Sequence, residues 1–190
     1  MSAQHEGTTA RVRMATPDDA QAVADIYAPY VADTAISFEV VPPTADDMRR
    51  RIETTLQRHP WLVYEEDGVV FGYAYASAHH AREAYQWSVG TAIYVDRTRH
   101  RSGLGRRLYG ALFPLLARQR YVNAYAGITL PNERSVGLHE ALGFRPVGVY
   151  RNVGFKLGQW RDVGYWHLLL QPLPKQPEPP LDWRELSPER

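Results

Sequence analysis

The chain has 190 residues, 44% hydrophobic and 23% charged, a composition typical of one globular domain with its own core. Its 22 basic and 21 acidic side chains leave a net charge of +1, so we expect neither nucleic acid nor an acidic membrane as a partner. The absence of cysteine excludes disulfides, thiolate metal sites and a cysteine nucleophile. The first nine residues are polar, and no apolar run reaches the roughly 20 residues of a membrane span, so we expect no secretory signal and a cytoplasmic protein.

The first third of the chain predicts a strand, two helices and a hairpin. After a strand over 11–14, Thr16 is a typical N-cap with Pro17 at the first helical position, and apolar residues then recur at helical spacing to Tyr27. Residues 34–43 predict a loop, and a second helix is expected from Thr44 to about His59. Strands over 61–64 and 69–76 are joined through Asp67-Gly68, a strong hairpin signal.

The rest of the chain predicts four more strands and two more helices. Strands are expected over 87–95, 122–128, 146–153 and 163–170, with helices from Leu104 to Leu115 and over 132–142. Five prolines between residues 172 and 180 predict an extended or disordered tail. We therefore expect an α+β fold, with a flexible lead over 1–9, one domain over 10–171 and a Pro-rich tail over 172–190.

The most informative segment joins the strand ending at Val95 to the helix beginning near Leu104. Its turn, His100-Arg-Ser-Gly103-Leu-Gly105, is basic and contains two glycines. A helix N-terminus offers unpaired N–H groups and partial positive charge, and glycines let the backbone approach an anion, so the turn fits a pyrophosphate. An ordinary turn with solvated arginines is the alternative. The spacing matches neither the dinucleotide fingerprint nor the Walker P-loop.

The same turn resembles the acetyl-CoA motif of the GCN5-related N-acetyltransferases (GNATs), Q/R-x-x-G-x-G/A, with His100 where Gln or Arg is usual. Asn132-Glu-Arg-Ser135-Val-Gly-Leu-His139-Glu-Ala-Leu-Gly143-Phe144 is similar to the family's next motif, and the segments around Trp61 and Trp160 resemble its phosphinothricin and methionine sulfoximine acetyltransferase branch. The resemblance implies a GNAT fold, with a mixed, mostly antiparallel sheet flanked by helices and splayed at the acetyl-CoA site. The residues expected to bind acetyl-CoA are Ile93, Tyr94, Val95, His100, Arg101, Ser102, Gly103, Leu104, Gly105, Arg106, Asn132 and Ser135.

The resemblance also implies catalytic residues. His139 occupies the position of a general acid that protonates the leaving thiolate; position alone favours a histidine packed in the core, and the surrounding motif favours the catalytic role. The branch has a glutamate base where this chain has Gly90. Glu39 is one candidate to replace that base, although it is equally well interpreted as a solvated carboxylate on a loop. Glu83 is a weaker candidate. A water chain, another side chain or the substrate's own ionisation remain alternatives.

The expected acceptor pocket consists of Phe38, Arg82, Tyr85, Gly90, Thr91 and Ala92. Arg82 would hold a substrate carboxylate, or else simply face solvent. His79 and His80 are adjacent; if they lie in a strand they point to opposite faces, and no acidic cluster follows them, so we expect no metal site.

We therefore predict an acetyl-CoA-dependent N-acetyltransferase acting on the amino group of a small amino-acid-like substrate of the phosphinothricin or methionine sulfoximine type. Acetylation of a protein N-terminus or another amine is an alternative, as is a CoA-binding module with little catalysis. The branch commonly forms homodimers, so a homodimer is expected.

Overall fold

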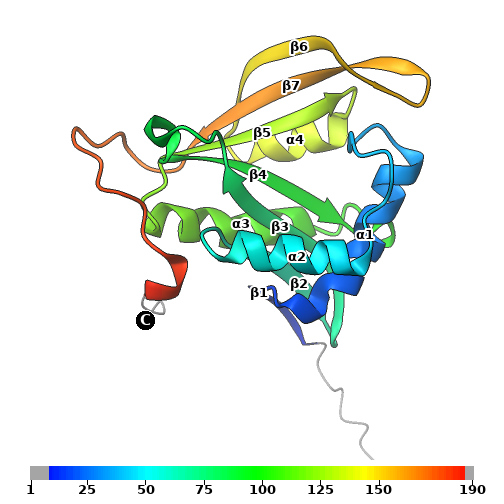
Figure 1. Ribbon diagram of the computed structural model, residues 1–190, viewed down its shortest axis with the longest axis horizontal. Coiled ribbons are helices and arrows are strands. Elements are labelled where there is room, and N and C mark those ends of the chain that lie inside the picture. Colours follow the sequence, from blue (N-terminus) through cyan, green and yellow to red (C-terminus); the bar gives the residue numbers. More distant parts are fainter. Residues whose placement is uncertain (1–8, 187–190) are drawn as a thin grey trace, which may run out of the picture.

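The computed structural model describes residues 9–186. The centre of the fold is a seven-stranded sheet (Figure 1). Its strand order is β1-β2-β3-β4-β5-β7-β6, and all neighbours pair antiparallel except β4 and β5. The strands are β1 (Ala10–Met14), β2 (Trp61–Glu66), β3 (Val69–Ala78), β4 (Ser88–Val95), β5 (Asn123–Leu130), β6 (Arg145–Lys156) and β7 (Gln159–Leu169). The mixed, mostly antiparallel sheet predicted from the sequence is confirmed.

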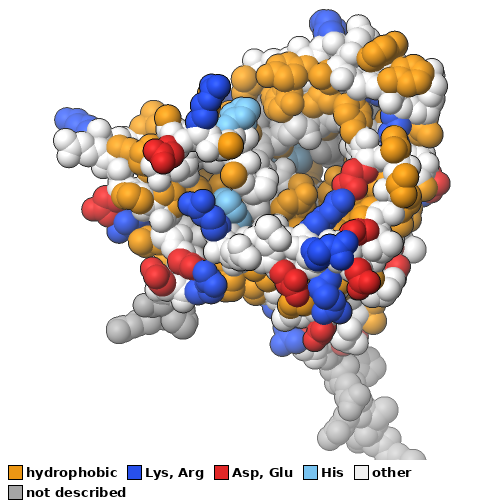
Figure 2. Space-filling model, viewed as in Figure 1, with side chains coloured by type: hydrophobic (Ala, Val, Ile, Leu, Met, Phe, Trp, Pro, Cys, Tyr) orange, Lys and Arg blue, Asp and Glu red, His pale blue; other side chains and the backbone are white. Residues whose placement is uncertain are grey.

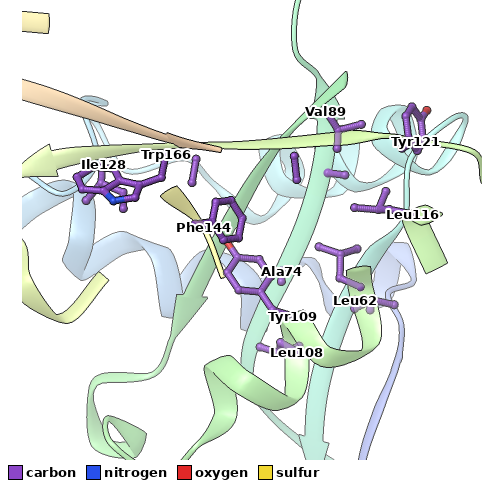
Figure 3. Close-up of a cluster of buried hydrophobic side chains, with 14 of the residues drawn as sticks. Leu62, Ala74, Val89, Leu108, Tyr109, Leu116, Tyr121, Ile128, Phe144 and Trp166 are labelled. Carbon is purple, nitrogen blue, oxygen red and sulfur yellow. The ribbon is translucent and has the colours of Figure 1, made fainter. Parts of the chain in front are cut away.

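Helices cover both faces of the sheet. On one face, α1 (Ala20–Asp33) and α2 (Ala45–Leu56) bury a cluster that includes Trp61 and Tyr73. On the other, α3 (Leu104–Arg118) packs on the inward side chains of β2 to β5, and α4 (Glu133–Ala141) lies beside β5. Figure 3 shows this second cluster, in which Tyr109 of α3 lies beside Phe144.

Helix ends differ from the expected positions for local reasons. Pro17–Asp19 forms a 3-10 turn before α1, and Thr16 and Asp19 form a capping box there. Thr44 caps α2 as expected by accepting a hydrogen bond from the Asp47 N–H at 3.2 Å. The helix ends at Leu56 rather than near His59, because the residue before Pro60 is disfavoured in helical geometry.

The parallel pair β4–β5 separates along its length. Residues 88–90 pair with residues 123–125, and no pairing follows, although β4 continues to Val95 and β5 to Leu130. The splayed strands expected from the sequence are therefore present, and they open a gap in the middle of the sheet.

The closing hairpin is longer than predicted. β6 and β7 meet at a tight turn, Leu157-Gly158, in which both residues have positive φ (52° and 74°). The strands continue up to this turn through two register shifts in β6, which interrupt the alternation that sequence analysis depends on. β6 is left as an edge strand with one unpaired side.

The sequence predicts an extended or a disordered tail. The described part of the tail is extended, and it packs on the domain. Gln119 and Leu181 exchange hydrogen bonds at 3.0 Å, and the Trp183 indole N–H donates to the Leu56 carbonyl at 2.9 Å. Most of the expected flexible lead lies outside the described residues, but the backbone N–H of Thr9 donates to Asp67. Within residues 9–186 no helix is long and apolar enough to cross a membrane.

Candidate functional site

A cleft of about 600 Å³ lies between the end of β4, the basic turn, the start of α3 and the start of α4. We call it the CoA cleft. Every residue predicted to bind acetyl-CoA lines it. The turn and the second motif, about 30 residues apart in sequence, are thus brought to one cavity, which is the arrangement a long ligand with a phosphate end requires.

The glycines of the turn shape the CoA cleft. Gly103 has φ +83° and lies directly before α3, in the left-handed region that side chains disfavour. A Cβ at Gly105 would lie 2.8 Å from a methyl carbon of Leu138, so the glycine allows α3 and α4 to approach. The first intrahelical donor is the Arg107 N–H, which bonds to the Gly103 carbonyl at 3.1 Å, so the preceding N–H groups remain available to an anion.

Four arginines line the CoA cleft and add positive charge at this helix N-terminus: Arg99, Arg101, Arg106 and Arg134. His100 organises the turn. Its Nδ1 accepts from Arg134 at 2.5 Å, so its Nε2 carries the proton and donates to the Tyr30 hydroxyl at 2.8 Å. Burial and the nearby Arg134 lower the pKa of His100, which keeps it neutral. The histidine that departs from the family motif therefore ties the turn to α1 and α4.

A smaller inner cavity of about 70 Å³ continues from the CoA cleft into the gap between β4 and β5. Thr91, Ala92 and His139 line it, together with Tyr109. His139 is 3% exposed; its Nδ1 donates to the Ser135 carbonyl at 2.7 Å, so Nε2 accepts from the Tyr109 hydroxyl at 3.2 Å. Burial lowers the pKa of His139 and raises that of Tyr109. The pair is neutral and places an O–H donor and an imidazole in the gap.

The opposite face of the sheet carries a third cavity of about 420 Å³, which we call the aromatic cavity. Trp61, Tyr73, Tyr75 and Tyr27 form much of its wall, and Arg51 lies at its edge. Figure 2 views this face, which is hollowed in the middle, with acidic, basic and histidine side chains around the hollow. Tyr94 lines all three cavities, so this one residue borders both faces of the sheet.

Glu39 is engaged in an ion pair. Its carboxylate accepts two hydrogen bonds from Arg51, at 2.7 and 2.9 Å, and one from the Tyr27 hydroxyl at 3.0 Å. The Arg51 guanidinium is the main cause of the lowered pKa of Glu39.

The loop that carries Glu39 is anchored on β6. Lys156 is 6% exposed, and its ammonium donates to the carbonyls of Val31, Ser37 and Glu39 at 2.6, 2.7 and 2.6 Å. The Phe38 ring packs against Gly154, where an added Cβ would clash with it at 2.2 Å. Phe38 thus fixes the loop, and Ile36 of the same loop lines both the CoA cleft and the inner cavity.

The remaining predicted acceptor residues, Arg82, Tyr85 and Gly90, line none of these three cavities. Arg82 is exposed, and Tyr85 is 41% exposed on a short 3-10 turn before β4. His79 and His80 do not point to opposite faces: β3 ends at Ala78, the strand alternation no longer applies, and the two rings lie 4.4 Å apart. Across the described residues, no group of three or more histidine and acidic side chains is placed to hold a metal ion.

Several lining residues were missed by sequence analysis. Tyr30, Ile36, Tyr109 and Arg134 face the cavities, yet only Arg134 falls inside a recognisable motif. Tyr109 follows the apolar spacing of α3 and reads as an ordinary core residue. Only the three-dimensional contact with His139 distinguishes it.

The whole domain resembles known acetyltransferases. A GNAT acetyltransferase domain matches residues 12–164. A phosphinothricin N-acetyltransferase of Streptomyces viridochromogenes is 41% identical over 88% of this chain and 91% of its own. A methionine sulfoximine/methionine sulfone acetyltransferase of Salmonella typhimurium is 32% identical over 84% of this chain and 94% of its own. A Sinorhizobium meliloti phosphinothricin acetyltransferase, solved with acetyl-CoA, superposes with a TM-score of 0.81 at 31% identity, covering 85% of this chain and 88% of that one.

The chain therefore belongs to the GNAT acetyltransferase family. It is an N-acetyltransferase that uses acetyl-CoA as cosubstrate. The CoA cleft fits that cosubstrate, because Gly103 leaves the backbone of the turn open to an anion and arginines surround it.

Proposed function

We propose that this enzyme acetylates the amino group of a small amino-acid-like acid of the phosphinothricin or methionine sulfoximine type. The similarity to enzymes named for both substrates supports this proposal. The structural observation that carries it is that Tyr94 lines both the CoA cleft and the aromatic cavity, so a compact acceptor bound in the aromatic cavity would be separated from the donor side by a single residue. Arg82, exposed on the loop between β3 and β4, is our candidate for binding the acceptor's carboxylate.

In this proposal acetyl-CoA supplies an activated acetyl group, and the protein positions it. The turn from His100 to Arg106 binds the phosphates, and backbone N–H groups of residues 93–95 bind the pantetheine arm and the thioester carbonyl. Asn132 and Ser135 line the arm where α4 begins. Thr91, Ala92 and Gly90 border the position of the reacting amine.

The His139–Tyr109 pair is our candidate for returning a proton to the leaving thiolate. In the resting structure the Tyr109 hydroxyl donates its proton to His139 Nε2, so the hydroxyl must turn toward the sulfur to protonate the thiolate, and the proton that the acceptor nitrogen gives up then restores the phenol. His139 then acts through Tyr109, and replacing either residue should lower kcat more than it raises KM.

The direct test is thiol release from acetyl-CoA by the purified protein with a panel of amines: phosphinothricin, methionine sulfoximine, ordinary amino acids and a short peptide. Turnover with the first two supports the proposal. Turnover with the peptide alone would favour a protein N-terminus as acceptor, and acetyl-CoA binding with no turnover would favour a CoA-binding module.

We also propose a homodimer formed through the β6–β7 hairpin. β6 is an edge strand, and the hairpin carries a row of exposed apolar side chains: Val147, Val149, Tyr150, Val153, Phe155 and Trp160. Light scattering should give twice the chain mass, and Phe155→Glu with Trp160→Glu should give the monomer. We place the enzyme in the cytoplasm, the compartment that supplies acetyl-CoA.

A further inference from the structure

The acceptor face must contain a group that takes a proton, because an amino-acid amine is mostly protonated near neutral pH and only the neutral nitrogen attacks a carbonyl. This inference rests on the proposed function above. Most titratable groups of the aromatic cavity do not suit the task. Burial raises the pKa of Tyr75 to about 12 and raises those of Tyr27 and Tyr94, so these phenols stay protonated. Glu39 is held by Arg51, which lowers its pKa and weakens it as a base.

His79 lies where a proton acceptor is needed. Gly90 pairs with Ser77 on one side and with Tyr125 on the other, at the last paired position before β4 and β5 separate. Tyr125 alternates along β5 with the buried Ala124 and Ala126, which face α3, so its ring lies on the acceptor face. The His79 imidazole stacks on that ring, with centroids 4.3 Å apart and planes at 18°.

The space beside His79 is open. Gly90 has no side chain, and a Cβ built there would meet only the Ser77 hydroxyl, at 3.4 Å, within 4 Å. A water or a small amine therefore has room between the imidazole and the gap in the sheet.

The imidazole of His79 is available as a base. Among the described residues, neither of its ring nitrogens has a hydrogen-bond partner, whereas the neighbouring His167 is bonded through Nε2 to Asn123 at 2.9 Å. The titratable groups around His79 are His80, Tyr85 and Tyr125, with His167 on the far side of Tyr125. Burial first, and His80 second, lower the pKa of His79, so it is neutral at pH 7.

We propose that His79 is the general base for the acceptor amine, taking its proton through water across the space at Gly90. The ammonium loses one proton to the imidazole. The neutral nitrogen then forms the C–N bond to the acetyl carbon as the C–S bond to coenzyme A breaks. The nitrogen then gives up its second proton, which replaces the proton that Tyr109 donates to the thiolate to form the free thiol, and the imidazolium of His79 releases its proton to water, so one proton is released overall.

The test compares His79→Gln with the matched control His80→Gln in the thiol-release assay, using the acceptor that the wild-type enzyme turns over best. We expect His79→Gln to lower kcat/KM for the amine at least 100-fold at pH 7, with an unchanged KM for acetyl-CoA. The lower pKa on the acidic side of the pH–rate profile should disappear, and added imidazole should restore part of the rate. His80→Gln should keep the acidic limb of the profile, moved slightly toward higher pH because His80 no longer lowers the pKa of His79, and its kcat/KM at pH 7 should stay within about twofold of wild type.

A second variant separates a lost base from a damaged fold. Gly90→Glu in the His79→Gln background places a carboxylate in the same space, and we expect it to recover activity that the single variant lacks. A His79→Gln enzyme with the wild-type rate and pH profile would overturn the assignment while leaving the acetyltransferase function intact. If Glu39→Gln instead removes the acidic limb, Glu39 is the base. A wild-type enzyme inactive on every amine would overturn the proposed function itself.

Discussion

Lys156 joins the β6–β7 hairpin to the loop between α1 and α2, so replacing it tests whether one buried ammonium holds that loop. Lys156→Met keeps most of the side-chain length and removes the three hydrogen bonds to carbonyls at 2.6, 2.7 and 2.6 Å. Each buried carbonyl left without a donor costs about 1–3 kcal/mol, and relief from burying an ammonium offsets part of this sum. We expect a net loss of about 3 kcal/mol in the free energy of unfolding.

Urea denaturation measures this loss directly, and the melting temperature should fall by roughly 6–12 °C for a domain of this size. Lys175→Met, at the chain's only other lysine, which is exposed in the tail, is the matched control and should change little. Because Ile36 of the anchored loop lines the CoA cleft, KM for acetyl-CoA should also rise. A loss below 1 kcal/mol with an unchanged KM would refute the anchoring role.

Three further predictions concern the turn, a buried histidine and the tail. Gly103→Ala places a side chain at φ +83°, which costs about 1–2 kcal/mol of backbone strain, so calorimetry should show acetyl-CoA binding roughly 5–30-fold weaker. The control Gly110→Ala, in open space on α3, should bind acetyl-CoA normally. Burial lowers the pKa of His59 to about 4, below its unfolded value near 6.5, so protonation favours the unfolded chain. Stability should therefore fall by about 1–2 kcal/mol between pH 6.5 and 4, allowing for partial solvent exposure, and a His59→Phe variant should lose that dependence in urea titrations. Trp183→Ala removes the hydrogen bond to the Leu56 carbonyl and should lower the melting temperature by several degrees, whereas Pro177→Ala should not.

The parts of the fold that depend on local chemistry could be predicted from the sequence. Asp67-Gly68 forms the expected turn with φ of 50° and 80°, and Thr44 caps its helix, because both features depend on a few consecutive residues. The acetyl-CoA turn was also recognisable, since its glycines meet backbone demands that only a few spacings satisfy.

The contacts that complete the site could not be predicted, because they join residues far apart in sequence. Lys156 reaches the Val31 carbonyl across 125 positions, and no pattern near Lys156 signals this contact. Applying the strand alternation to His79 and His80 gave the wrong orientation, because β3 ends at Ala78, before both residues. The stack of His79 on Tyr125 depends on the strand order of the sheet, which single-sequence periodicity does not contain.

Tyr94 constrains how this enzyme can change its substrate preference during evolution. The CoA cleft, the inner cavity and the aromatic cavity all include this residue, so a substitution there alters the donor and acceptor sides together. A mutation that admits a bulkier acceptor at this position would also disturb the position of the acetyl group. New acceptors are therefore more easily accommodated by changes in the exposed loop that carries Arg82 and Tyr85, where side chains can vary without moving the donor. We therefore expect the sequence of β4 around Tyr94 to stay constant among related enzymes while the residues of the exposed loop vary with the acceptor.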